Sequence, residues 1–206
     1  MRIERIEVSR HKRGRVLVFL EGGALLKVTE QELLDFGLRK GDVLDEETLE
    51  RLKKASGVSD TKATAADLIG RKAMSRRDLE RKLREKGANE AEARYAAEWL
   101  EAIGAIDDAA YAAALVRHCG DKGYGPAKTK EKLYEKGVPR ELWEDALEEL
   151  PGNEEQIEKF LTAKLRGEYP DEKEKKRLID ALLRRGFPWG DIKRVFGRLL
   201  DTYFED

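Results

Sequence analysis

The chain has 206 residues, of which 40% are hydrophobic and 40% are charged. This composition is too apolar for a disordered chain and too charged for one thick core, so it favours thin helical layers in which each helix buries one stripe. The 41 basic and 42 acidic residues give a net charge of −1, which excludes a uniformly polycationic protein. Any affinity for a polyanion must therefore come from local segregation of charge.

Few side chains are available for metal or redox chemistry. The chain has one cysteine, Cys119, so it cannot form an internal disulfide, and its two histidines, His11 and His118, are too few for most metal sites. No apolar run approaches the ~20 residues of a membrane span, and residues 1–10 lack the apolar core of a signal peptide. We therefore expect a soluble cytoplasmic protein with no metal, no cofactor and no membrane partner.

Residues 1–55 predict a small β-rich module. Its expected strands are rich in β-branched and apolar residues, and Gly22 and Gly23 provide the positive φ that a tight hairpin requires. Thr29 is a good N-cap for a short helix, and a second short helix follows. The strands are expected at 3–9, 16–20 and 24–28, the short helices at 30–38 and 45–56, and a linker at 56–60.

From residue 60 onward the sequence is helical and repeats. Three segments, LREKG, LYEKG and LLRRG, end in Gly87, Gly137 and Gly186, at intervals of 50 and 49 residues. Each glycine is expected to end a helix in the left-handed conformation and to turn the chain sharply into the next helix. Two residues after each glycine comes a residue suited to starting a helix. These residues are Asn89, Pro139 and Pro188.

Apolar residues six, ten and thirteen positions after each glycine form an i, i+4, i+7 stripe, three times over. Each unit also has room for a preceding helix, and Asp108 is expected to cap that helix in the second unit. A three-helix unit cannot bury its own stripe fully, so neighbouring units must stack. The predicted fold is mainly α, an elongated array of three helix-turn-helix-like repeats behind the β-rich module. The repeats are expected to span 60–104, 105–150 and 151–206.

The middle helix of every repeat is basic, although the net charge of the whole chain is close to zero. Residues 71–86 carry eight basic and three acidic residues, whereas 117–136 and 172–185 each carry six basic and three acidic ones. If the repeats stack with similar geometry, these helices form a basic stripe suited to a polyanionic partner or an acidic protein groove. The alternative is that charged helix faces are simply solvated. Both interpretations stay open.

The sequence contains no common catalytic motif. It has no G-x-x-x-x-G-K-[ST] phosphate loop, no H-E-x-x-H and no G-x-S-x-G. His118 and Cys119 are adjacent, so on a helix their side chains diverge by about 100° and cannot form a base–nucleophile pair. Cys119 is expected in the core, and Ser75 with Asp78 is expected to start a helix as a capping box. We therefore expect a protein that is not an enzyme.

The helical region combines basic-glycine helix ends with an Asp-x-x-Tyr-Ala pattern at Asp108, Tyr111 and Ala112. The segments concerned are SRRDLERKLREKG (75–87), DDAAYA (107–112), KGYGPAKTKEKLYEKGV (122–138) and LLRRGF (182–187). In this order and spacing they resemble the RecX family, the bacterial modulators of the RecA recombinase. The resemblance covers residues 60 to about 200, although the third repeat lacks the Asp-x-x-Tyr-Ala pattern.

The resemblance implies a non-enzymatic regulator that binds RecA filaments on single-stranded DNA and inhibits filament growth, ATP hydrolysis and strand exchange. The alternative is a helical-repeat protein that binds single- or double-stranded DNA directly, although acidic neighbouring helices and a pI of about 6.3 argue against strong DNA binding. We expect a monomer. The residues predicted to contact the partner are Arg81, Arg84, Lys86, Lys122, Tyr124, Lys128, Lys132, Lys136, Arg184 and Arg185.

Overall fold

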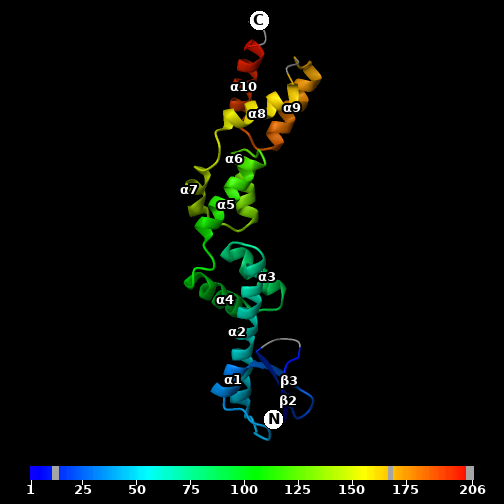
Figure 1. Ribbon diagram of the computed structural model, residues 1–206, viewed down its shortest axis with the longest axis vertical. Coiled ribbons are helices and arrows are strands. Elements are labelled where there is room, and N and C mark those ends of the chain that lie inside the picture. Colours follow the sequence, from blue (N-terminus) through cyan, green and yellow to red (C-terminus); the bar gives the residue numbers. More distant parts are fainter. Residues whose placement is uncertain (11–13, 167–168, 203–206) are drawn as a thin grey trace. The chain divides into compact units, whose positions relative to one another are not determined.

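The structure is a computed structural model that describes residues 1–10, 14–166 and 169–202, with side chains as far as Leu199. Within these ranges one three-stranded sheet is followed by ten α-helices and one 3₁₀ turn (Figure 1). This confirms the prediction of a mainly α chain behind a small β-rich module. The chain forms two compact units, residues 1–73 with 79–106 and residues 74–78 with 107–206.

Three strands pair in the antiparallel order β1-β2-β3 at the start of the chain. β2 (Arg15–Leu20) lies between β1 (Ile3–Val8) and β3 (Leu25–Thr29). The turn before β3 places Gly22 and Gly23 at φ of 87° and 84°, as predicted. The sheet and the helices that follow it enclose one hydrophobic cluster. Its buried members are Ile3, Val16, Val18, Leu20, Val28, Leu38, Leu44, Leu49 and Leu52.

Two helices complete this module, and the second differs from the prediction. α1 (Glu30–Asp35) has Thr29 as its N-cap, as predicted, and a capping box stabilises its first turn. α2 (Glu46–Arg71) is a single helix of 26 residues. The linker predicted over 56–60 is therefore wrong, because the helix continues through it.

The small polar residues that suggested a linker instead bind the sheet and α1. Ser56 Oγ donates a hydrogen bond to the backbone carbonyl of Lys27 on β3. Ser59 Oγ donates to the Glu32 carboxylate in the first turn of α1. These partners offset the low helix propensity of the serines and of Gly57 between them, so tertiary contacts decide the local structure.

The remaining helices are arranged around the three predicted glycine turns. Gly87, Gly137 and Gly186 have φ of 99°, 68° and 86°, which confirms their left-handed conformation. The second and third groups of helices each enclose a hydrophobic cluster of their own. The exact repeat boundaries stay predictions. The helices are α3 (Arg76–Glu85), α4 (Glu90–Ala102), α5 (Asp108–Asp121), α6 (Pro126–Glu135), the 3₁₀ turn η1 (Arg140–Leu142), α7 (Trp143–Leu147), α8 (Asn153–Leu165), α9 (Glu172–Arg184) and α10 (Trp189–Thr202).

Two helix ends differ from the predictions. The N-cap of α5 is Asp107 and not Asp108, and the Asp107 side chain accepts a hydrogen bond from the first turn at 2.9 Å. Asp108 has a different partner, because its Oδ1 accepts from the backbone amide of Arg76 at 2.8 Å, at the start of α3. α7 ends at Leu147, so the predicted stripe residue Leu150, which precedes a proline, lies beyond the helix.

Within the second compact unit, the glycine turn that ends α9 docks on the start of α6. The Gly125 amide donates to the Arg185 carbonyl at 2.8 Å, and the Ala127 amide donates to the Gly186 carbonyl at 3.1 Å. A Cβ added at Gly125 would lie 2.6 Å from the Gly186 carbonyl oxygen. The carbonyl end of one middle helix thus meets the amide end of another, an orientation in which their dipoles attract.

The same packing recurs where the turn after α6 meets the first residues of α3, which belong to the same unit. Ser75 Oγ donates to the Lys136 carbonyl at 2.5 Å, and a Cβ added at Gly137 would lie 3.1 Å from Arg77 Cβ. Ser75 Oγ also accepts from the Asp78 amide at 3.1 Å, which confirms one half of the predicted capping box. The glycine turns of this unit therefore both end a helix and dock it on another.

Candidate interaction surface

Three of the four predicted lysines of the second repeat form one row along α6 and its end. Lys128, Lys132 and Lys136 are four residues apart, a spacing that places side chains on one helix face. Lys128 pairs with Glu131 at 2.6 Å and Lys132 with Glu135 at 2.7 Å. The hydrogen bond with Glu135 raises the pKa of Lys132, so this ammonium group stays charged at neutral pH. We call these three residues the α6 lysine row.

Arg185 is held by contacts within the chain. Its Nη1 donates to the Lys122 and Gly123 carbonyls at 3.0 and 3.2 Å. Its guanidinium carbon lies 4.9 Å from the centroid of the Phe160 ring. These contacts tie the turn after α9 to the turn between α5 and α6. Arg185 thus supports the packing of two repeats, whereas Arg184 beside it is exposed.

Three of the predicted residues, Tyr124, Arg184 and Arg185, line one hollow of about 570 Å³ in the second unit. Arg177 lies seven residues before Arg184, so both project from the same face of α9 into it. Lys164 of α8 supplies a fourth cation. We call this the basic hollow, and its lining residues are Tyr124, Phe160, Lys164, Glu174, Arg177, Leu178, Ala181, Arg184 and Arg185.

Tyr124, one of the predicted contact residues, is half-buried. It lines the basic hollow. Lys122, close to it in the chain, is exposed, and its carbonyl accepts a hydrogen bond from Arg185.

Sequence reasoning missed Lys164 and Arg177 as members of this site. Arg177 carried a usable signal, because a residue seven positions before Arg184 lies on the same face of a helix. Lys164 carried none, since its place depends on how α8 packs against α9. The α6 lysine row lies outside the basic hollow.

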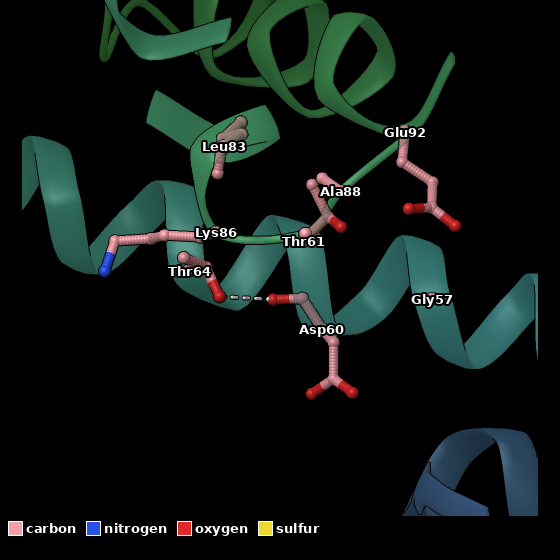
Figure 2. A pocket seen from close by; sticks show the side chains of 9 residues that line it. Gly57, Asp60, Thr61, Thr64, Leu83, Lys86, Ala88 and Glu92 are labelled. Atoms are coloured by element: carbon pink, nitrogen blue, oxygen red, sulfur yellow. Dashed lines mark hydrogen bonds between the residues drawn. The ribbon is translucent and has the colours of Figure 1, made fainter. Parts of the chain in front are cut away.

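The predicted residues of the first repeat lie in the first compact unit. Arg81 pairs with Glu85 at 2.6 Å across one helical turn, and Arg84 is exposed. Lys86 lines a small pocket of about 180 Å³ between α2 and the turn from α3 to α4. Figure 2 shows its ammonium group at the opposite end of this pocket from the Glu92 carboxylate. None of these three cations lines the basic hollow.

Other reactive groups were also located. Cys119 is buried, as predicted, and burial raises the pKa of its thiol, which keeps it protonated at neutral pH. Among the residues described, no three His, Cys, Asp or Glu side chains are grouped in a way that could hold a metal ion. No helix in the described ranges is both long and apolar enough to cross a membrane.

The fold and this surface define a class of protein, in which three-helix repeats follow a small antiparallel sheet and basic residues gather on the middle helices. Residues 107–147 match the family model described as RecX, second three-helix domain. Residues 154–196 match the model described as RecX, third three-helix domain.

Similar proteins and structures extend the match over most of the chain. Regulatory protein RecX of Pseudomonas putida strain W619 is 34% identical over 143 residues, which is 68% of this chain and 92% of that protein. Regulatory protein RecX of Clostridium acetobutylicum is 27% identical over 202 residues, 94% of each chain. A crystal structure of regulatory protein RecX has a TM-score of 0.70 at 25% identity and covers 95% of this chain and 98% of its own. The chain belongs to the RecX family of regulatory proteins.

Proposed function

We propose that this protein regulates the RecA recombinase by binding RecA filaments on single-stranded DNA and limiting filament growth, ATP hydrolysis and strand exchange. The observation that carries the proposal is membership of the RecX family, with a regulatory protein matched over 94% of this chain. The protein acts by binding, and its partner is a macromolecule that the basic residues of the middle helices recognise.

The proposed contact surface in the second unit consists of the α6 lysine row and the basic hollow. α6 and α9 meet end to end, so both helices can present cations to the same partner. An acidic groove on the partner would pair with these cations and steer the encounter. Arg81, Arg84 and Lys86 of the first unit and Lys122 of the second complete the proposed set.

Reversing the charge of the α6 lysine row, by Lys128→Glu, Lys132→Glu and Lys136→Glu, tests its role. We expect the variant to keep its helical circular dichroism spectrum and to lose about tenfold or more in inhibition of RecA ATP hydrolysis, because like charges across an interface repel. A matched control reverses three exposed lysines of the same unit that lie outside the row, which are Lys130, Lys176 and Lys193. Unchanged inhibition by the row variant, or an equal loss in the control, would contradict the proposed contact.

Direct nucleic-acid binding is the second candidate function, and the four cations of the basic hollow favour it. A protein that contacts DNA phosphates loses affinity steeply as salt rises, in proportion to the number of phosphates contacted. Binding to single- and double-stranded DNA should therefore be measured over a range of salt without RecA. Tight, salt-steep binding combined with no effect on RecA hydrolysis would favour this function over filament regulation.

A further inference from the structure

Three cations that line the basic hollow have no hydrogen-bond or ion-pair partner among the described residues. They are Lys164, Arg177 and Arg184. Some cations of this unit do pair with a carboxylate one helical turn away, as Lys175 does with Glu172 at 2.8 Å. Like charges that converge on one hollow repel each other, and an anion bound between them would relieve this repulsion. The arrangement therefore points to an anionic ligand from outside the chain.

The helices hold these cations around a space of suitable size. Arg177 and Arg184 project from one face of α9, and Lys164 projects from α8 into the same hollow. The volume of about 570 Å³ falls within the range of small-ligand sites, about 300–1,000 Å³. Among the lining residues that the structure describes, Glu174 is the one carboxylate, against four cations when Arg185 is included.

The lining also favours one class of anion. One face of the Phe160 ring is covered by the Arg185 guanidinium at 4.9 Å, which limits base stacking and leaves charge pairing as the main mode of recognition. Arginine presents a planar fork of N–H donors that matches two oxygens of a phosphate. A single carboxylate would be satisfied by one such arginine, whereas a phosphate with several charges can engage several cations together.

We propose that the basic hollow is a binding site for a phosphate-bearing anion with two or more negative charges, bound by Arg177, Arg184 and Lys164. The phosphate belongs either to a free oligophosphate compound or to the backbone of a nucleic acid, which share this chemistry. Binding requires this chain alone and no recombinase. The site and the proposed function can therefore fail independently.

Isothermal titration calorimetry of the full chain with inorganic triphosphate at low salt tests the site. We expect saturable binding of one triphosphate per chain, and Arg177→Gln and Arg184→Gln should each weaken it about tenfold or more, because each removes a charge-assisted hydrogen bond. Lys176→Gln is the matched control, since it removes the same charge from an exposed α9 residue that does not line the hollow. Absence of saturable binding, or an equal weakening by Lys176→Gln, would overturn the proposal.

Two competing ligands test whether the site prefers phosphate to carboxylate and whether the phosphate belongs to a nucleic acid. Citrate carries several carboxylates and no phosphate, so citrate binding as tight as that of triphosphate would overturn the assignment to phosphate. A single-stranded oligonucleotide is then added to the triphosphate complex. If the oligonucleotide displaces triphosphate from the wild-type protein but not from Arg177→Gln, the site is supported and its natural ligand is a nucleic-acid backbone. If triphosphate stays bound when the oligonucleotide is added, the site is supported and its natural ligand is a free phosphate compound.

Discussion

Arg15 is 6% exposed, and its ion pair with Asp60 at 3.0 Å compensates the burial of its charge. The Nη1 atom of Arg15 has no hydrogen-bond partner within the described chain, so little else stabilises this guanidinium. Asp60 falls in the segment that the sequence suggested to be a linker. The contact between Arg15 on β2 and Asp60 on α2 thus helps to explain why this segment is helical, which local helix propensity did not predict.

We expect Asp60→Ala to lower the free energy of unfolding by about 2–4 kcal/mol, because it leaves the Arg15 charge buried without a counterion. Asp67→Ala in the same helix is the control. It removes the ion pair with Arg71, in which both side chains are more than half exposed, and should cost less than about 1 kcal/mol. Urea unfolding of both variants measures the difference, and equal losses would show that the Arg15 pair is not the stabilising contact.

Gly87 and Gly186 have similar backbone conformations but different surroundings. A Cβ at Gly87 would meet no heavy atom within 4 Å, whereas a Cβ at Gly186 would collide with the Lys128 backbone at the start of α6. Gly87→Ala should therefore cost about 1–2 kcal/mol for the positive φ alone. Gly186→Ala should cost a further 1–3 kcal/mol or so for overpacking, measured by urea unfolding. Equal costs would argue against the docking of α9 on α6.

At the scale of the helices, the sequence predicted where helices begin and end better than which elements they pack against. Thr29 and Gly137 fulfil their predicted roles because capping and left-handed turns depend on residues close in the chain. Ser56 was wrongly predicted to lie in a linker, because its hydroxyl binds a strand residue 29 positions away in the chain. For the same reason the basic hollow was only partly predicted: Arg177 lies on a predicted basic helix, but Lys164 joins it through packing between two helices.

The N-cap of α2, Asp45, allows the contribution of a helix cap to be tested by changing the pH. The Asp45 carboxylate accepts from the Thr48 amide at 2.7 Å, and this hydrogen bond lowers the pKa of Asp45 from its usual 3.8. The folded-state pKa lies below the unfolded one, so the stabilisation is present above pH 3.8 and is lost as the pH falls through the lower folded value. Asp45→Asn should therefore unfold with a weaker acid dependence. Parallel loss of thermal stability in both proteins below about pH 4 would contradict this role.

For the whole molecule, the net charge of −1 hides how the charges are sorted. The ten residues predicted to contact a partner divide between the two compact units, three in the first and seven in the second. In the second unit, the turn after α9 docks on the start of α6, so two basic helices meet end to end. A regulator of a helical filament would use such a surface to contact its partner at several points.

Regulation of the RecA filament is tested most directly by measuring single-stranded-DNA-dependent ATP hydrolysis by RecA while this protein is titrated in below the RecA concentration. DNA binding by the protein alone is measured at the same salt. Filament regulation predicts a strong substoichiometric loss of hydrolysis, with DNA binding too weak to sequester the strand. Unchanged hydrolysis together with tight, salt-steep DNA binding would contradict filament regulation and make direct DNA binding the primary function.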